Sequence, residues 1–186
     1  MDTILISIMA YTATNIDDIF ITALLFSRAD TAGRRRRVIR GRYAGIFILT
    51  TIGILGAGTA RTVMRQYVHL LGIIPLAMGI KEAAGRIKNS DAETQYSHNS
   101  NMLLYATGMT IASGGDNIGV YIPLIAGMSG SETAVLCAVF AVMTGLWCLA
   151  GYCIVKIPLL QNILAKHKKL IVPVVYIALG VYILAG

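Results

Sequence analysis

The chain has 186 residues, of which 56% are hydrophobic and only 13% are charged, and its formal net charge is +7. Soluble domains carry about 25% charged residues, so the composition indicates an integral membrane protein and leaves no room for a sizeable soluble domain. The basic excess does not indicate nucleic-acid binding. The basic residues lie in short connections between apolar runs, where they set topology and contact anionic lipid headgroups.

Six apolar runs separated by polar breaks predict an all-α integral membrane protein with one transmembrane domain of six helices. A helix needs about 20 residues to cross a ~30 Å hydrocarbon layer, and most of the runs have that length. We expect the first run to stay in the membrane instead of being cleaved as a signal peptide, because Asp2 precedes it where a basic residue would be expected. The predicted spans are about 3–27, 43–62, 68–85, 102–128, 132–155 and 170–185.

The basic residues of the connections predict which way the helices point. The first connection holds Arg28 and six further arginines from Arg34 to Arg42, and the third and fifth connections hold three and four basic residues. These 14 of the 16 basic residues fall on one side of the membrane. The positive-inside rule places that side in the cytoplasm and both termini outside. The polar stretch 89–101 is predicted as a cytoplasmic linker between the two halves of the chain.

The two halves, about residues 1–88 and 102–186, are predicted to be inverted repeats of three helices each. Placing residue n against residue n + 99 aligns two acidic motifs near the centres of the first and fourth spans. The aligned pairs are Ala13 with Ala112, Thr14 with Ser113, Asp17 with Asp116, Asp18 with Asn117 and Ile19 with Ile118, and a weaker match pairs 76–79 with 177–180. Inverted repeats hold substrate near the membrane midplane, often at discontinuous helices. The alternative is chance similarity between two apolar helices.

The aligned motifs bring carboxylates to membrane depth, where each costs at least about 2.5 kcal/mol and indicates a function. Adjacent residues of a helix point about 100° apart, so Asp17 and Asp18 face one ligand together only if the helix unwinds near Asn15. Otherwise one of the two faces a neighbouring polar group. Gly114 and Gly115 favour a helix break in the second motif, because glycine is a poor helix former. Carbonyls freed at such a break can coordinate a cation.

Together the motifs predict an oxygen-rich metal site at the bilayer midplane. Two carboxylates neutralise a divalent charge, and amide and hydroxyl oxygens add hard ligands. The same carboxylates could take protons when the metal leaves, which would exchange metal for protons. A purely structural alternative is that these side chains only join helices by hydrogen bonds. The candidate ligands are Thr14, Asn15, Asp17, Ser113, Asp116 and Asn117, together with Asp18 as third carboxylate or as counter-charge.

With these motifs the chain resembles the cadmium resistance transporter family (the CadD-type proteins) of the lysine-exporter superfamily, over essentially its whole length. The resemblance is carried by the stretches Ala13–Phe20 and Gly114–Pro123. It implies a small multi-pass protein of the bacterial cytoplasmic membrane that lowers cellular cadmium by efflux. It also implies that Asp17, Asp18, Asp116 and Asn117 belong to the site. Cadmium is soft and prefers thiolate, whereas the motifs supply oxygen, so the physiological ion stays open.

We therefore expect a secondary transporter that exports a divalent heavy-metal cation, cadmium by resemblance, in exchange for protons. No cofactor is expected, and no nucleotide-binding loop or catalytic motif indicates an enzyme. The expected partners are the cation, protons and membrane lipid, without nucleic acid. Glycine-rich helix faces suit a homodimer as well as packing within one protomer. The sequence leaves open an exporter of manganese, calcium or a basic amino acid, and a membrane protein that sequesters metal.

Cysteine residues offer the alternative soft ligands for cadmium. All three lie in the fifth predicted span, and their spacing is typical neither of a disulfide framework nor of a zinc site. We interpret Cys148 and Cys153 as inert core residues.

Overall fold

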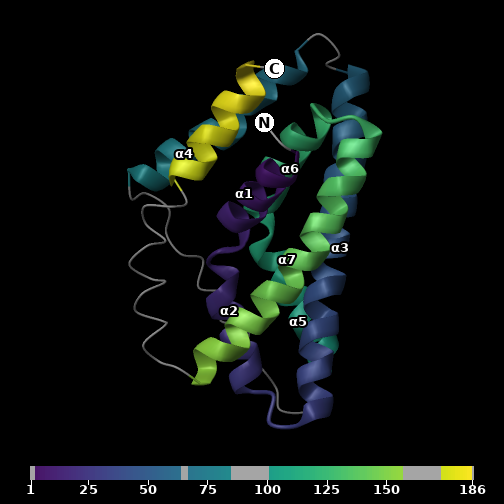
Figure 1. The fold of residues 1–186 in the computed structure, drawn as a ribbon, viewed down its shortest axis with the longest axis vertical. Helices are drawn as coiled ribbons and strands as arrows, with labels where there is room; N and C mark the ends of the chain where they lie inside the picture. Colours follow the sequence, from purple (N-terminus) through teal and green to yellow (C-terminus); the bar gives the residue numbers. More distant parts are fainter. Residues whose placement is uncertain (1–2, 64–66, 85–100, 157–172, 186) are drawn as a thin grey trace.

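A computed structural model describes residues 3–63, 67–84, 101–156 and 173–185, and every element in these ranges is a helix (Figure 1). This confirms the all-α prediction. The helices are α1 (Thr3–Asn15), α2 (Asp18–Ser27), α3 (Ala32–Val63), the 3-10 helix η1 (Val68–Gly72), α4 (Ile73–Ala83), α5 (Met102–Ser113), α6 (Gly115–Ala126), α7 (Gly130–Lys156) and a last helix, Pro173–Ala185.

The lengths of these helices bear on the number of membrane spans. In the described ranges, α3 and α7 are each long and apolar enough to cross a membrane, and α1 with α2 makes a third span if the bent pair counts as one. The other apolar helices are shorter. The chain is thus a helical membrane protein by length and composition, whereas six complete spans stay a prediction.

The first acidic motif falls at a break between two helices. α1 ends at Asn15, α2 begins at Asp18, and the two helix axes differ in direction by 62°. The side chain of Asn15 turns back and donates from Nδ2 to the carbonyl of Tyr11 at 3.0 Å. Such side-chain bonds to the backbone compete with helix formation, which explains why asparagine and aspartate favour helix ends. The unwinding near Asn15, one of the two expected arrangements, is therefore present.

The second motif also falls at a break, at Gly114. α5 ends at Ser113, and Gly114 lies between it and the start of α6 at Gly115. A Cβ atom built on Gly114 would lie 2.4 Å from Cδ1 of Leu49 on α3. A side chain at this position would collide with that of Leu49, so glycine permits the close approach of Leu49 to this break.

The two broken helices run in opposite directions and lie against each other. α1 contacts α6 and α2 contacts α5, so the breaks meet in the interior of the molecule (Figure 1). Each long helix packs chiefly on the broken helix of the other half: α3 packs on α5 and α6, and α7 packs on α1 and α2. Packing of each long helix on the other half is the arrangement that an inverted repeat would produce. The inverted repeat itself stays a prediction.

The two segments of the weaker predicted match contact each other. Helix α4 and the last helix run antiparallel along one side of the molecule (Figure 1). Their glycines leave almost no space between the backbones: a Cβ on Gly79 would lie 2.8 Å from the nitrogen of Ile177, and one on Gly180 would lie 2.6 Å from the nitrogen of Leu76.

A stripe of glycines along α3 allows the same close approach to α5 and α6. A Cβ on Gly41 would lie 2.6 Å from Cβ of Ala106, and one on Gly45 would lie 2.5 Å from Cβ of Thr110. This stripe therefore packs within the protomer and does not require a homodimer.

The prediction for the first connection is wrong in its extent. It treats residues 28–42 as a connection and starts the second span at 43, whereas α3 begins at Ala32. Thr31 accepts a hydrogen bond through Oγ1 from the backbone nitrogen of Arg34 at 3.2 Å, which satisfies a donor of the first turn. Arginine is a good helix former, so the basic run continues the helix. As a result, Arg42 lies inside the bundle with 0% exposure instead of in a loop.

Only part of the other predicted connections lies within the described residues. Residues 85–100, most of the predicted linker, lie outside the described residues. Asn101 caps α5, because its side chain accepts from the nitrogen of Leu103 at 3.1 Å. At the opposite end of the molecule, Arg61 donates to carbonyls of Ala126 and Met128, and so stabilises the C-terminal end of α6.

Candidate functional site

A fully buried tyrosine joins the two breaks. The hydroxyl of Tyr121 on α6 accepts from Nδ2 of Asn15 at 3.2 Å and lies 3.4 Å from Oγ1 of Thr14. Asn15 and Thr14 end α1, so this hydroxyl ties the end of one broken helix to the other broken helix. Tyr121 lies four residues after Asn117, which places both on one face of α6.

Asn117 completes this hydrogen-bond network. Its amide is best satisfied when Nδ2 donates to the carbonyl of Thr14 and to Oδ1 of Asp116, and its oxygen accepts from the Tyr121 hydroxyl, each at 3.1 Å. Asn117 is 1% exposed, and an amide this deeply buried needs such partners. The network therefore links both motifs through the Tyr121 side chain and the carbonyl of Thr14.

The carboxylate of Asp116 already accepts several hydrogen bonds. Oδ1 accepts from the backbone nitrogen of Asn117 at 3.0 Å, and Oδ2 accepts from the hydroxyl of Tyr176 at 2.9 Å. Tyr176 belongs to the last helix and is 2% exposed. Asp116 thus connects the second break to the last helix, which packs on α4.

Helix α7 forms a wall on the α1 side of the site. Nε1 of Trp147 donates to the carbonyl of Asn15 at 2.6 Å, and the hydroxyl of Tyr11 donates to Oγ1 of Thr144 at 3.1 Å. The carbonyl of Asn15 is one of those freed by the end of α1. Because Trp147 bonds to that carbonyl, helix α7 covers the first break on this side instead of leaving it open.

The three aspartates of the motifs differ in their surroundings. Asp17 is half-buried in the first break, and its charge acts on Asp116 across the gap between the motifs. Asp18 is 4% exposed and forms an ion pair with Arg42: Nη2 of Arg42 donates to Oδ2 of Asp18 at 2.9 Å. Asp18 is expected from the sequence to act either as a third metal-binding carboxylate or as a counter-charge. Its ion pair with Arg42 is a contact of the second kind.

The structure therefore brings most of the predicted ligands together. Thr14, Asn15 and Asn117 meet around Tyr121, and Asp116 adjoins Asn117. Ser113 donates to the carbonyl of Met109 at 3.0 Å and its hydroxyl lies close to Asp18. Gly115 lies at the exposed start of α6 with no atom near its missing Cβ, in contrast to the tightly packed Gly114.

Four residues of this region were not singled out from the sequence, namely Arg42, Tyr121, Trp147 and Tyr176. A signal existed for two of them. Tyr121 follows Asn117 by one helical turn, and Arg42 lies beside the glycine stripe of α3. Tyr176 and Trp147 reach the site only through the packing of distant helices, which the sequence does not specify.

Within the described ranges, no group of three or more histidine, cysteine, aspartate or glutamate side chains gathers in a way that could hold a metal. A cation at the breaks would therefore need amide, hydroxyl or backbone oxygens besides its carboxylates. Cys148 is buried among apolar side chains beside α2, and Cys137 and Cys153 are half-buried free thiols.

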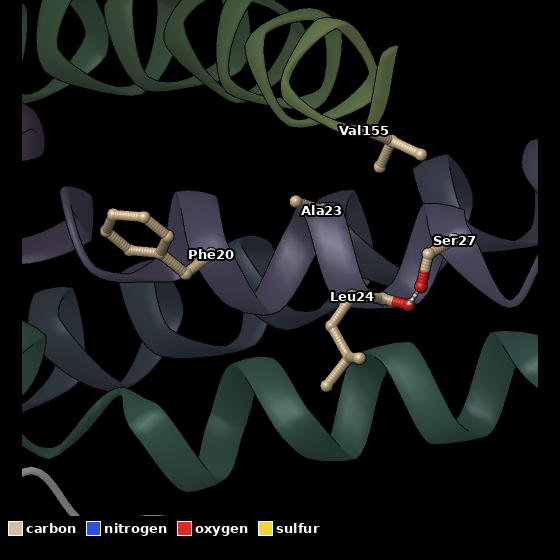
Figure 2. Close-up of a pocket in the computed structure, with 5 residues that line it drawn as sticks. All are labelled: Phe20, Ala23, Leu24, Ser27 and Val155. Carbon is tan, nitrogen blue, oxygen red and sulfur yellow. Dashed lines mark hydrogen bonds between the residues drawn. The ribbon is translucent and has the colours of Figure 1, made fainter. Parts of the chain in front are cut away.

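A surface pocket of about 320 Å³ lies elsewhere, between α2 and α7 (Figure 2). It is lined by Phe20, Ala23, Leu24, Ser27 and Val155. Its one hydroxyl, that of Ser27, already donates to the carbonyl of Leu24 at 2.8 Å. Such an apolar lining offers a metal cation no ligand, so the pocket is not the cation site.

These features define a class: a helical membrane protein whose interior holds two helix breaks lined by carboxylates and amides. The family model described as cadmium resistance transporter matches residues 11–186. The chain belongs to this family, since the match covers nearly all of its length. Comparison with curated proteins and with solved structures found no match.

Proposed function

We propose that this protein exports a divalent heavy-metal cation, cadmium first of all, across the bacterial cytoplasmic membrane in exchange for protons. The observation that carries the proposal is the meeting of two helix breaks, joined by Tyr121, in the interior of a cadmium resistance transporter family member. Helix breaks expose backbone carbonyls and helix ends, which is how many secondary transporters bind ions away from water.

The ligands of the proposed site come from both motifs. Asp17 and Asp116 supply two carboxylates, which neutralise a divalent cation. Amide oxygens of Asn15 and Asn117, hydroxyls of Thr14 and Ser113, and carbonyls of the first break are the further oxygen donors. This set suits cadmium less well than a thiolate would, and it suits manganese or calcium better. The ion that is transported fastest must therefore be measured.

The proposed coupling to protons follows from the repulsion between Asp17 and Asp116. Asp17 and Asp116 are both partly buried carboxylates that act on each other, so they repel unless a cation or protons neutralise them. When the metal leaves, protons would replace it. Binding of one would then exclude the other, which is what an exchanger requires.

The proposed export would also move the last helix. The Tyr176 hydroxyl donates a hydrogen bond to Oδ2 of Asp116, and a metal bound to this oxygen would compete with that bond. Release of Tyr176 would free the last helix together with α4, which packs on it through glycines. Alternating access would then arise from a change at Asp116.

The test is uptake into proteoliposomes under an imposed pH gradient, with cadmium, zinc and manganese compared. We expect cadmium flux that follows the gradient and is lost in Asp116→Asn. Asp30→Asn is the matched control, because Asp30 is exposed and pairs only with Arg34 four residues on in the described contacts. Tight binding without flux would indicate metal sequestration instead, and gradient-driven flux of lysine without metal flux would indicate a basic amino acid exporter.

A further inference from the structure

Arg42 is a permanently charged side chain enclosed within the bundle. Its side chain is 0% exposed, and a guanidinium cannot lose its proton in a protein. Nη1 donates to Oγ1 of Thr110 on α5 at 2.9 Å, and Nη2 donates to Oδ2 of Asp18 on α2 at 2.9 Å. Among the described residues, its Nε has no hydrogen-bond partner. Arg42 thus joins three helices at a site where its own donors are only partly satisfied.

Stability alone does not explain such a pair. Burying two charges costs several kcal/mol per ion, and well-packed apolar residues in their place are often equally or more stable. An unpartnered buried donor adds a further cost of about 1–3 kcal/mol. A buried pair retained under these conditions points to a function for the charge itself.

The pair lies beside the proposed cation site. Asp18 directly follows Asp17 at the first break, and the Ser113 hydroxyl at the second break lies close to Asp18. Thr110, the second partner of Arg42, lies one helical turn before Ser113 on α5. The charge of Asp18 also acts on Asp116. A charge at Arg42 or Asp18 is therefore felt by a cation between the breaks.

We infer that Arg42 is the fixed counter-ion of Asp18 and that this pair sets the charge which the breaks present to the substrate. The inference rests on the proposed function. Three carboxylates and one guanidinium leave a net charge of −2, which a divalent cation neutralises completely. Arg42 is a specificity-determining residue that acts through Asp18 and does not ligate the metal.

The inference predicts opposite effects for the two members of the pair. Arg42→Gln removes a positive charge and leaves the site with an excess negative charge, which favours trivalent cations. Asp18→Asn leaves the guanidinium uncompensated and disfavours every cation, trivalent ones most. The double variant, Asp18→Asn with Arg42→Gln, removes one charge of each sign, so its preference between trivalent and divalent ions returns to that of the wild type.

The experiment is competition between terbium(III) and cadmium(II) for the purified protein in detergent, followed by terbium luminescence. Trp147, beside the first break, serves as the sensitiser. We expect the ratio of terbium to cadmium affinity to rise at least about tenfold in Arg42→Gln and to fall by a similar factor in Asp18→Asn. Arg34→Gln is the matched control, because its pair with Asp30 is solvent-exposed and screened by salt.

The outcomes separate this inference from the proposed function. No cadmium binding by the wild type would overturn the proposed function, and the inference with it. Binding by the wild type with the same affinity ratio in Asp18→Asn and Arg42→Gln would overturn the inference alone. If Arg42→Gln does not fold, the test rests on Asp18→Asn and on Arg42→Lys, which keeps the charge and is expected to keep the ratio. A changed ratio in Arg42→Lys would then contradict the inference.

Discussion

At the scale of single residues, the two asparagines at the breaks link the broken helices to each other by buried hydrogen bonds. Asn15 and Asn117 are both buried, and each bonds to Tyr121 and to backbone groups at or near the end of α1. A buried polar group is inexpensive only when its partners are complete. The Tyr121 hydroxyl supplies a partner to both amides, so part of the stability of the breaks depends on this hydroxyl.

Tyr121→Phe tests this dependence. It removes the hydroxyl and leaves the amides of Asn15 and Asn117 short of partners inside the protein. We expect a loss of about 1–3 kcal/mol in the free energy of unfolding, measured by denaturation in detergent. Tyr67→Phe, at a tyrosine that is 56% exposed, is the control and is expected to leave the stability unchanged. Equal stability of both variants would show that the hydroxyl does not hold the breaks together.

Tyr176→Phe addresses the carboxylate of Asp116. The hydroxyl of Tyr176 donates to Oδ2 of Asp116, and a bound metal has to compete with that hydrogen bond. We expect cadmium to bind up to about tenfold more tightly in the variant, because the competitor is gone. Titration calorimetry measures the change, and Tyr182→Phe, at an exposed tyrosine of the same helix, is the control. Weaker binding in Tyr176→Phe would instead make the hydroxyl a part of the metal site.

At this scale, the sequence predicts the polar residues of the motifs better than the side chains that bond to them. Asn15, Asp17, Asp116 and Asn117 stand out because polar residues in apolar runs are costly. Arg42 does not stand out, because six arginines nearby make it look like part of a solvated charge run. Its burial depends on where α3 begins and on how α3 packs against α5, and both are decided by tertiary contacts.

At the scale of elements, the helix breaks depend on residues in the same turn, whereas the packing around them depends on distant parts of the chain. Glycine and asparagine act on their own turn, so a break at Gly114 and an unwinding near Asn15 could be foreseen. The start of α3 at Ala32 could not, because a run of arginines suits a helix end, a helix interior and a loop alike. The approach of Leu49 to Gly114 follows from that longer helix and its glycine stripe.

Gly114→Ala and Gly115→Ala form a matched pair that tests the packing at the second break. A Cβ at position 114 would lie 2.4 Å from Leu49, whereas one at position 115 meets no atom within 4 Å. We expect Gly114→Ala to lower the free energy of unfolding by about 1–3 kcal/mol through overpacking and to reduce cadmium flux. Gly115→Ala is expected to be neutral in both measurements. Identical behaviour of the two variants would mean that α3 does not constrain the break.

At the scale of the whole molecule, the described connections between the long helices lie at two ends of the bundle. The α2–α3 connection and the end of α7 lie at one end, and the end of α3 with the α6–α7 connection lies at the other (Figure 1). Fourteen of the 16 basic residues belong to the connections expected in the cytoplasm, although one of them, Arg42, is buried inside the bundle. The remaining arginines still favour the same orientation.

Fusions of reporter proteins test this orientation. We expect alkaline phosphatase to be active and green fluorescent protein to be dark when fused after residue 186, because both termini are expected outside. The opposite result is expected for fusions at Asp30, in the α2–α3 connection. A fluorescent fusion at the C-terminus would contradict the expected outward C-terminus.

The central claim is that the two helix breaks hold the transported cation, and equilibrium binding tests it most directly. Cadmium binding to the purified protein should be measured for the wild type, Asp17→Asn and Asp116→Asn, with Asp30→Asn as control. We predict a single tight site in the wild type and in the control, and at least about tenfold weaker binding in each of the other variants, with the helical circular dichroism unchanged. Wild-type affinity in both Asp17→Asn and Asp116→Asn would place the cation elsewhere and contradict the account.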